Sequence, residues 1–210
     1  VDKSQLQFLQ EICDNILNSS GIILIYSEYI DGGLIPVALA LEELGFTRYG
    51  EQDSLFKNPP TAPIDSNNYE PRTRKNENTF NSAKYTMITG DKRYSPNNMK
   101  ELKDLNKEEN KNGEKIKVVL ISKAGYEGLD FKNIRQVHVM EPWYNMNRIE
   151  QIIGRAVRNC SHKELRFSQR NVLIYLYGTI LENVEVEAAD LYIYRLAEKK
   201  SKEIGVISRL

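Results

Sequence analysis

Three polar side chains recur at helical spacing in the second half of the chain: Gln151, Arg155 and Arg158. At about 100° per residue, they would lie within roughly 60° of one another on a helix. Guanidinium groups bind phosphate through fork-shaped, charge-assisted hydrogen bonds, and they stabilise charge that develops on a transferring phosphoryl group. Two arginines three residues apart are more often only a solvated basic face. Phosphate chemistry is therefore possible here, and the surrounding sequence has to decide between the two interpretations.

A helix must position these side chains, and the residues between them supply its buried face. Asn145 suits the N-cap of such a helix. Four apolar residues then project from the side opposite to the arginines, namely Ile149, Ile152, Ile153 and Ala156. This spacing predicts a helix over 145–158 that packs on one face and presents the two arginines and the glutamine on the other.

Short apolar runs elsewhere predict strands buried on both faces. They cover residues 22–26, 85–89, 116–121, 136–140 and 171–177. Apolar residues at helical spacing predict further helices over 4–17, 36–44, 95–105 and 184–204. Strands that alternate with helices indicate an α/β fold with a mostly parallel sheet covered by helices on both faces.

Polar turns follow three of these runs where the strands end, with Ser27, Thr89, Gly90, Ser122 and Lys123. Parallel α/β sheets bind ligands outside the carboxyl ends of their strands, so these turns predict a binding surface along one edge. Gly128 belongs to the turn after residues 116–121, where a glycine permits close approach of a backbone or a phosphate.

Two segments carry a resemblance to a known family. Residues 120–130, LISKAGYEGLD, resemble motif V of superfamily 2 helicases, and residues 151–158, QIIGRAVR, resemble motif VI. Their order and separation are similar to those of the second RecA-like domain of that family. The resemblance is strongest to the Swi/Snf-like branch, which includes helicases and early-transcription ATPases of large DNA viruses.

The resemblance implies a RecA-like fold and a role for each candidate residue. Arg155 and Arg158 would act as arginine fingers, with Gln151 beside them, on ATP held by another lobe. Gly128 and Asp130 would contact the nucleotide or the partner lobe, although a simple turn residue is an equally good interpretation of Asp130. The backbone of DNA or RNA would be contacted by Ser27, Thr89, Gly90, Ser122 and Lys123.

Neither a G-x-x-x-x-G-K-[ST] segment nor an acidic D-E-x-[DH] box occurs in the 210 residues. These segments hold the phosphates and the magnesium ion in a P-loop ATPase. The first residue is Val1 rather than Met, which indicates part of a longer protein. We therefore expect an N-terminal RecA-like lobe of the same polypeptide to bind ATP and Mg²⁺, and this chain alone to bind neither and to be inactive.

Two other function classes stay open at this point. One is a nucleic-acid-binding module that works without ATP, and the other is a regulatory protein that lends its arginines to a separate ATPase. The 29 Lys and Arg residues balance 29 Asp and Glu residues, so binding to nucleic acid would need a local basic patch rather than an overall positive field.

Composition excludes several further classes. Cys13 and Cys160 are far apart and have no Cys/His cluster around them, so we expect neither a metal site nor a disulfide scaffold. His138 and His162 are equally poor candidates for a functional site. The sequence has no signal peptide and no run of eighteen apolar residues, which predicts no membrane contact and an intracellular, soluble protein, in the cytoplasm or, for a viral protein, in the virion.

We expect residues 1–210 to form a single domain with a leading helix in 1–20 and a C-terminal helix in 183–210. Residues 50–84 interrupt the pattern, because they hold four of the seven prolines and six asparagines and show no sustained apolar period. A loop of this length inside a compact domain indicates a polar insertion, which we expect to be partly disordered.

Overall fold

A computed structural model describes residues 3–50, 53–123, 128–181 and 186–208. Within them, six parallel strands form one sheet in the order β2-β3-β4-β1-β5-β6. The strands are β1 (Ile22–Tyr26), β2 (Thr47–Arg48), β3 (Lys84–Ile88), β4 (Val118–Ile121), β5 (Ile134–Val139) and β6 (Leu173–Leu176). The predicted α/β fold with a parallel sheet is confirmed. Only β2 escaped the sequence analysis, because two residues are too few to form an apolar run.

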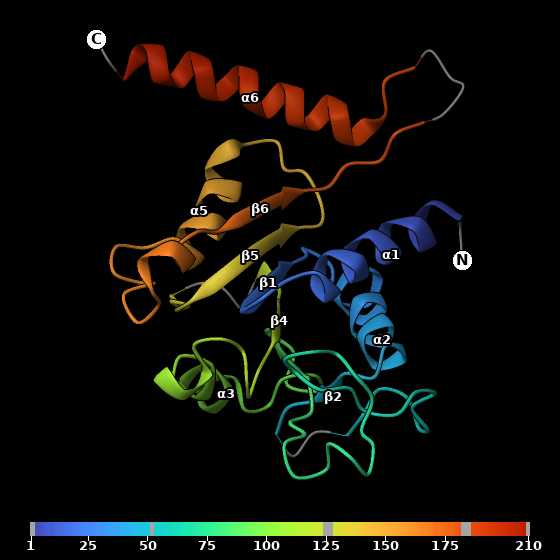
Figure 1. The fold of residues 1–210 in the computed structure, drawn as a ribbon. Helices are drawn as coiled ribbons and strands as arrows, with labels where there is room; N and C mark the ends of the chain where they lie inside the picture. Colours follow the sequence, from blue (N-terminus) through green and yellow to red (C-terminus); the bar gives the residue numbers. More distant parts are fainter. Residues whose placement is uncertain (1–2, 51–52, 124–127, 182–185, 209–210) are drawn as a thin grey trace.

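Helices cover both faces of the sheet (Figure 1). One layer contains α1 (Lys3–Leu17) and α2 (Ile35–Glu43), and the other contains α3 (Asn98–Leu105) and α5 (Met146–Ala156). The central strand β1 sends Ile23 and Ile25 into the first core and its remaining side chains into the second. Because successive side chains of a strand point to opposite faces, a strand between two helical layers is apolar at every position. Short turns of other helix types lie at Ile30–Leu34, Glu108–Asn110 and Phe167–Gln169.

The strand order reverses around β1. From β1 the chain passes through α2 to β2, which lies at one edge, and it then returns through β3 and β4 to β5 on the other side of β1. The connection after β1 contains α2 and covers one face of the sheet, whereas the connections after β3 and β5 contain α3 and α5 and cover the other face. In open α/β sheets such a reversal leaves a crevice at the carboxyl ends of the strands, and the polar turns after β1, β4 and β5 meet there.

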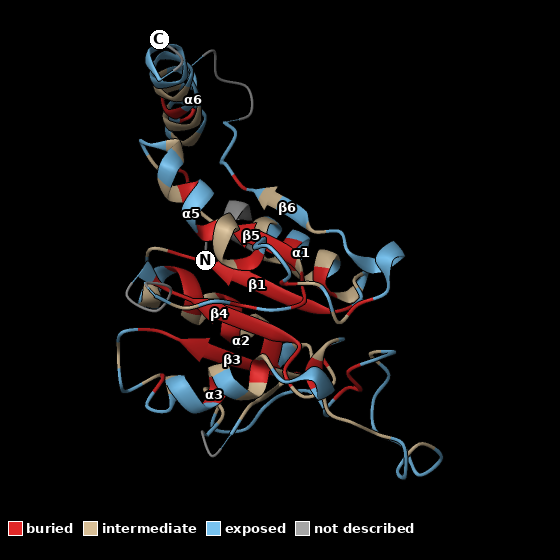
Figure 2. Ribbon diagram, turned by 90° about the vertical axis from the view of Figure 1, so that its left-hand side faces the viewer, coloured by how far each residue is buried: buried red, intermediate tan, exposed pale blue. Residues whose placement is uncertain are grey.

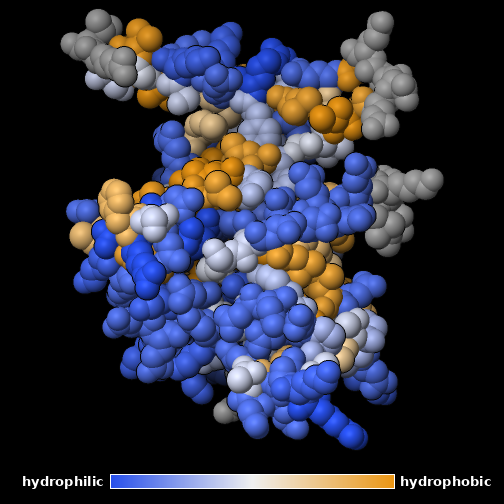
Figure 3. Space-filling view, viewed as in Figure 1, coloured by the Kyte–Doolittle hydropathy of each residue, from blue (hydrophilic) through white to orange (hydrophobic). Residues whose placement is uncertain are grey.

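The C-terminal helix α6 (Ala189–Ile207) lies outside the two layers and packs beside α5 (Figures 1 and 2). Ala197 is fully buried, whereas Ile204 and Val206 are exposed. Apolar side chains also gather on the face below α6 (Figure 3), where Leu173 and Ile174 of the edge strand β6 are about half exposed. None of the helices in the described ranges has the length and apolar character needed to cross a lipid bilayer.

The segment that we predicted as an insertion forms neither helix nor strand over residues 53–83, apart from two isolated bridges. Its side chains nevertheless reach into the domain, because Ile64, Asp65 and Ser66 are buried. The predicted polar, irregular connection therefore agrees with the structure, and its partial disorder stays a prediction.

Two side chains fix this segment to the body of the domain. The buried carboxylate of Glu42 in α2 accepts hydrogen bonds from the backbone N–H groups of Leu55 (2.8 Å) and Phe56 (2.9 Å). The hydroxyl of Tyr69 lies 3.1 Å from the carbonyl oxygen of Ile16, at the end of α1. The segment is thus attached at both helices of one layer. Its longest exposed stretches are residues 57–63, between these two points, and residues 70–75, after Tyr69.

Candidate functional site

Helix α5 presents the predicted site residues, but it is shorter than the sequence indicated. Its buried face contains Ile149, Ile152 and Ala156, as the spacing predicted, and Ile153, the fourth residue predicted there, is partly buried. The helix ends at Ala156, because Val157 has φ −107° and ψ 76°. The predicted helix is thus confirmed over Met146–Ala156, but its predicted end at 158 was wrong, and so was the face that Arg158 was expected to share.

Only Gln151 and Arg155 share the outer face of α5, one turn apart. Gln151 is exposed, and the side chain of Arg155 is 24% exposed. Asn145 takes the predicted N-cap position, but its side chain makes no capping hydrogen bond.

The carboxylate of Asp130 joins the two arginines despite this difference. Its Oδ2 lies 2.5 Å from Nη1 of Arg158, and its Oδ1 lies 3.6 Å from Nη1 of Arg155. The carbonyl oxygen of Asp130 accepts a hydrogen bond from the Asn106 side chain at 2.8 Å, which fixes the backbone beside the ion pairs. Two guanidinium groups from different elements therefore converge on one half-exposed anion.

The turn before Asp130 contains Gly128, whose φ is +76°. A Cβ atom there would meet no atom within 4 Å, so the left-handed backbone and not a lack of space favours glycine. The contact of Gly128 with a nucleotide stays a prediction. Residues 124–127 of the same predicted motif lie outside the described residues.

Glu141 lies two residues after the end of β5 and organises the turn after β1, and no pattern in the sequence indicated this role. Its carboxylate accepts the hydroxyl hydrogen of Ser27 at 2.6 Å and the backbone N–H of Glu28 at 3.1 Å. Burial raises the pKa of Glu141 to about 7; the hydrogen bond from Ser27 opposes this shift and nearby Asp190 adds to it. The hydroxyl of Ser27 is therefore buried and bound within the domain, and its predicted contact with nucleic acid stays a prediction.

A second group of side chains crosses the same crevice between β1 and α5. Arg148 forms an ion pair with Glu28, donates to the hydroxyl of Tyr26 at 2.9 Å, and stacks 3.9 Å from the ring centre of Trp143. Lys123 is exposed, and its Nζ lies 3.9 Å from Glu28. Arg148 had no signal in the sequence, because its partner Glu28 lies 120 residues earlier in the chain.

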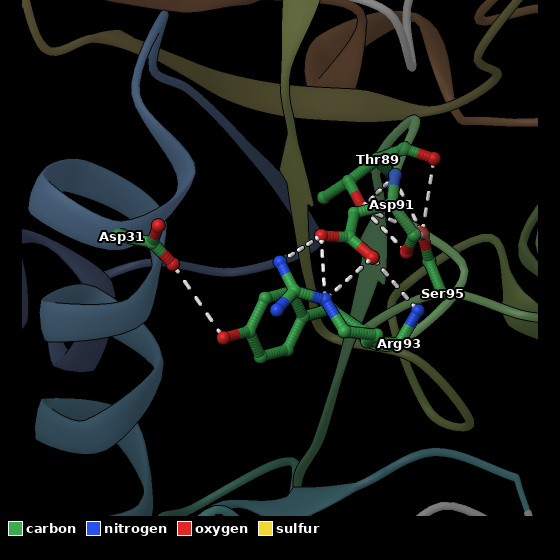
Figure 4. A network of polar contacts seen from close by, with 6 residues as sticks. Asp31, Thr89, Asp91, Arg93 and Ser95 are labelled. Atoms are coloured by element: carbon green, nitrogen blue, oxygen red, sulfur yellow. Dashed lines mark hydrogen bonds and ion pairs between the residues drawn. The ribbon is translucent and has the colours of Figure 1, made fainter.

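The turn after β3 is held by a compact polar network (Figure 4). The buried hydroxyl of Thr89 lies 2.7 Å from that of Ser95, and the carboxylate of Asp91 binds the guanidinium of Arg93. Gly90 is exposed at the tip of this turn. The Thr89 side chain thus shapes the turn from inside, while the backbone at Gly90 faces outward.

Ser122, at the end of β4, is also buried, and its hydroxyl has no hydrogen-bond partner among the residues that the structure describes. Two of the five residues predicted to contact nucleic acid are exposed, Gly90 and Lys123. The other three are buried, namely Ser27, Thr89 and Ser122. The structure thus brings all five to one edge of the sheet, as predicted, but it buries three of their side chains.

Comparison with known proteins identifies the family. Residues 69–160, which include both arginines and Asp130, match the helicase conserved C-terminal domain. This chain contains a helicase C-terminal domain. A putative ATP-dependent RNA helicase of Acanthamoeba polyphaga mimivirus, R350, is 38% identical over 119 residues, which cover 53% of this chain and 15% of the relative. A termination factor NPH-I homolog of African swine fever virus is 33% identical over 173 residues, which cover 78% of this chain and 24% of the relative.

The fold of this helicase C-terminal domain is also that of a solved structure. The C-terminal part of the Fun30 ATPase domain superposes with a TM-score of 0.51 at 13% identity, covering 92% of this chain and 43% of the other. This likeness confirms the RecA-like fold. The chain spans less than a quarter of the length of the curated relatives described above.

Proposed function

We propose that this helicase C-terminal domain is the second lobe of an ATP-dependent helicase or translocase that acts on DNA or RNA. In this proposal, Arg155 and Arg158 reach across a cleft to ATP bound by an N-terminal RecA-like lobe of the same polypeptide. The observation that supports it most directly is the convergence of both guanidinium groups on Asp130. The names of the mimivirus and African swine fever virus relatives, one an ATP-dependent RNA helicase, agree with this class of function.

The geometry fits a phosphate ligand. Two guanidinium groups that already share a carboxylate can share the oxygens of a phosphate, which has a similar size and carries more charge. Asp130 would hold them until the nucleotide arrives, and Gly128 would leave its turn open to the ligand. Gln151, one turn before Arg155 on the exposed face of α5, would lie beside the same phosphate.

ATP and Mg²⁺ would be held mainly by the other lobe. We assign the phosphate cradle and the magnesium carboxylates to it, because neither sequence segment occurs in these 210 residues. The bound nucleotide supplies the phosphoryl group that is transferred to water. The residues of this domain contribute positive charge, directed at the oxygens on which negative charge develops.

Nucleic acid would lie along the carboxyl ends of the strands. Lys123 and the backbone at Gly90 are exposed there and would contact the phosphates of the strand. Ser27, Thr89 and Ser122 would contribute through the shape of their turns, since their side chains are buried. Such contacts to phosphates do not depend on base sequence.

The test replaces the arginines in a protein that carries both lobes. Arg155→Ala and Arg158→Ala should each lower nucleic-acid-stimulated ATP hydrolysis about a thousandfold or more, as loss of an arginine finger does. Arg195→Ala is the matched control, because Arg195 is also exposed and its guanidinium lies 2.6 Å from a carboxylate, that of Glu187.

The rate of ATP hydrolysis is measured beside the melting temperature of each variant. All three variants should melt close to the wild type, since exposed ion pairs contribute at most about 1 kcal/mol. Near-normal hydrolysis by both Arg155→Ala and Arg158→Ala would reject the proposal, because this domain would then take no part in hydrolysis and would at most bind nucleic acid.

A further inference from the structure

Arg158 lies outside α5, so contacts with neighbouring segments must fix the position of its backbone. It lies beyond the last residue of α5, so no helical hydrogen bond fixes its backbone. Cys160, two residues later, has a left-handed backbone with φ +62°, which turns the chain back toward α5. A guanidinium that must reach a phosphate with an accuracy of a few tenths of an ångström needs other restraints on its main chain.

The side chain of Ser161 supplies the first restraint. Its Oγ accepts the backbone N–H of Arg158 at 3.2 Å, and it lies 2.8 Å from the carbonyl oxygen of Arg158 and 3.2 Å from that of Ala156. Ser161 is 8% exposed, so these contacts are shielded from water. One hydroxyl thus closes the end of α5 and holds the backbone of Arg158.

His162 orients that hydroxyl. Its Nδ1 lies 2.8 Å from Oγ of Ser161, and its Nε2 lies 2.6 Å from the carbonyl oxygen of Ile134 at the start of β5. A carbonyl can only accept, so Nε2 donates its hydrogen to Ile134, and a second hydrogen bond joins Nδ1 to Oγ of Ser161. A continuous chain of hydrogen bonds therefore leads from β5 through His162 and Ser161 to the N–H of Arg158.

A second set of bonds joins the same two segments. The backbone N–H of Asn133 donates to the carbonyl oxygen of Ser161 at 3.0 Å, and its side chain donates to Glu164 at 2.9 Å. Phe131 N–H donates to the carbonyl oxygen of Arg155 at 3.1 Å. Residues 131–133, which follow Asp130, are therefore bound to residues 155–164, which include both arginines.

We propose that Ser161 and His162 are positioning residues for Arg158 in ATP hydrolysis. This inference rests on the proposed function, because it assigns their role to the orientation of a guanidinium toward the transferring phosphate. Neither residue would touch the nucleotide. Their contribution is to keep the backbone of Arg158 in one place while its side chain exchanges Asp130 for phosphate.

The experiment uses the protein with both lobes and compares Ser161→Ala and His162→Phe with the wild type. Each variant breaks the chain of hydrogen bonds and should lower kcat of ATP hydrolysis about tenfold to a hundredfold, the effect of misplacing a catalytic group by about 1 Å. KM for ATP should change by less than about threefold, because the lost interaction matters chiefly in the transition state. The double variant should be no slower than the slower single variant, because both act through the same chain.

Ser19→Ala is the matched control. The Oγ of Ser19 lies 2.8 Å from the carbonyl oxygen of Ile16, three residues earlier at the end of α1, which is the same contact that Ser161 makes with Arg158. This variant should lower the melting temperature about as much as Ser161→Ala, and it should leave kcat unchanged. All rates are measured well below the lowest melting temperature, and His162→Phe serves if Ser161→Ala does not fold.

The outcomes separate the inference from the proposed function. If Arg158→Ala abolishes hydrolysis while Ser161→Ala and His162→Phe keep the kcat of the wild type, the positioning role is wrong and the proposed function stands. The positioning role is equally wrong if the effects of the two single variants multiply in the double variant. If Arg158→Ala itself hydrolyses ATP normally, the proposed function fails and the inference fails with it.

Discussion

Buried ionisable side chains at the carboxyl edge of the sheet make its turns sensitive to their protonation. Glu141 receives hydrogen bonds from Ser27 and Glu28 while its carboxyl is largely withdrawn from water. His138, in β5, is fully buried between Tyr177 and Gln136, and burial lowers its pKa to about 4. The neutral form of each group is thus favoured by folding.

These two shifts predict opposite effects of pH on stability. The pKa of Glu141 rises from 4.5 to about 7 on folding, so its contribution to stability is fully present below about pH 4.5 and is lost as the pH rises to about 7. His138 acts in reverse, because its stabilising contribution is lost as the pH falls from about 6.5 to about 4. Glu141→Gln removes only the first effect.

Urea unfolding of the wild type and of Glu141→Gln between pH 4 and pH 8 measures this contribution. The stability of the wild type relative to the variant should fall across pH 4.5 to 7 and stay constant above that range. His138 cancels in the difference because both proteins contain it. A difference that does not change with pH would show that the carboxyl of Glu141 is not buried as the structure indicates.

Neighbouring residues of α5 should differ sharply in their effect on stability. Ile152 is 1% exposed between the helix and the sheet, whereas Gln151 beside it is exposed. Ile152→Ala should lower the free energy of unfolding by roughly 2 to 5 kcal/mol, as truncation of a core side chain does. Gln151→Ala should change it by less than about 0.5 kcal/mol. Equal effects in urea titrations would contradict the orientation of α5.

Among the larger elements, the irregular segment between β2 and β3 combines fixed and exposed parts. Glu42 and Tyr69 bind it to α2 and α1, and Ile64 is buried against the core. Residues 71–75 are exposed throughout, and the loops of this segment project away from the sheet (Figure 2). Susceptibility to proteases should therefore be concentrated in the exposed part and not spread over residues 50–84.

Limited digestion with trypsin should first cut after Arg72, Arg74 or Lys75, and the two fragments should stay associated because β2 and β3 remain paired. Tyr69→Phe should accelerate this cleavage, since it removes the hydroxyl that reaches the end of α1. Mass spectrometry identifies the sites, and size-exclusion chromatography tests the association. Cleavage that begins in a helix or a strand would refute this prediction.

The described residues form a RecA-like parallel sheet covered by helices, and in our proposal it supplies only the phosphate-directed side of a nucleotide site. The ion pairs of Asp130 and the polar turns lie together on one edge of the sheet, so a ligand there would be covered by protein on one side only. We therefore expect the purified chain to hydrolyse no ATP and to bind it, if at all, with a Kd on the order of 1 mM, an affinity of about −4 kcal/mol.

Calorimetry and a phosphate-release assay check this prediction on the isolated chain. Adding an N-terminal lobe with a phosphate cradle, joined in the same polypeptide, should produce hydrolysis that depends on Mg²⁺ and nucleic acid. Arg158→Ala in the isolated chain controls for contaminating ATPases, because a contaminant would not respond to it. Turnover by the isolated chain that this substitution abolishes would overturn the assignment to a two-lobe enzyme.

The sequence by itself determined the layered α/β fold and the buried face of α5. A strand buried on both faces is apolar at successive positions, as in β1, and a helix packed on one face repeats its apolar residues every three or four positions, as in α5. Gly128 was likewise predictable as a special backbone position. These features depend on residues that are close in sequence, and burial leaves a periodic pattern in their order.

The tertiary structure alone decided which polar groups meet. It ended α5 before Arg158, paired both arginines with Asp130, tied Ser161 and His162 to the start of β5, and brought Glu141 to Ser27 across 114 residues of chain. A polar contact of this kind requires the order of the strands in the sheet and the geometry of single turns. Periodicity encodes burial but neither of these, because a hydrogen bond needs only one partner at the right distance and places no repeating constraint on the sequence between them.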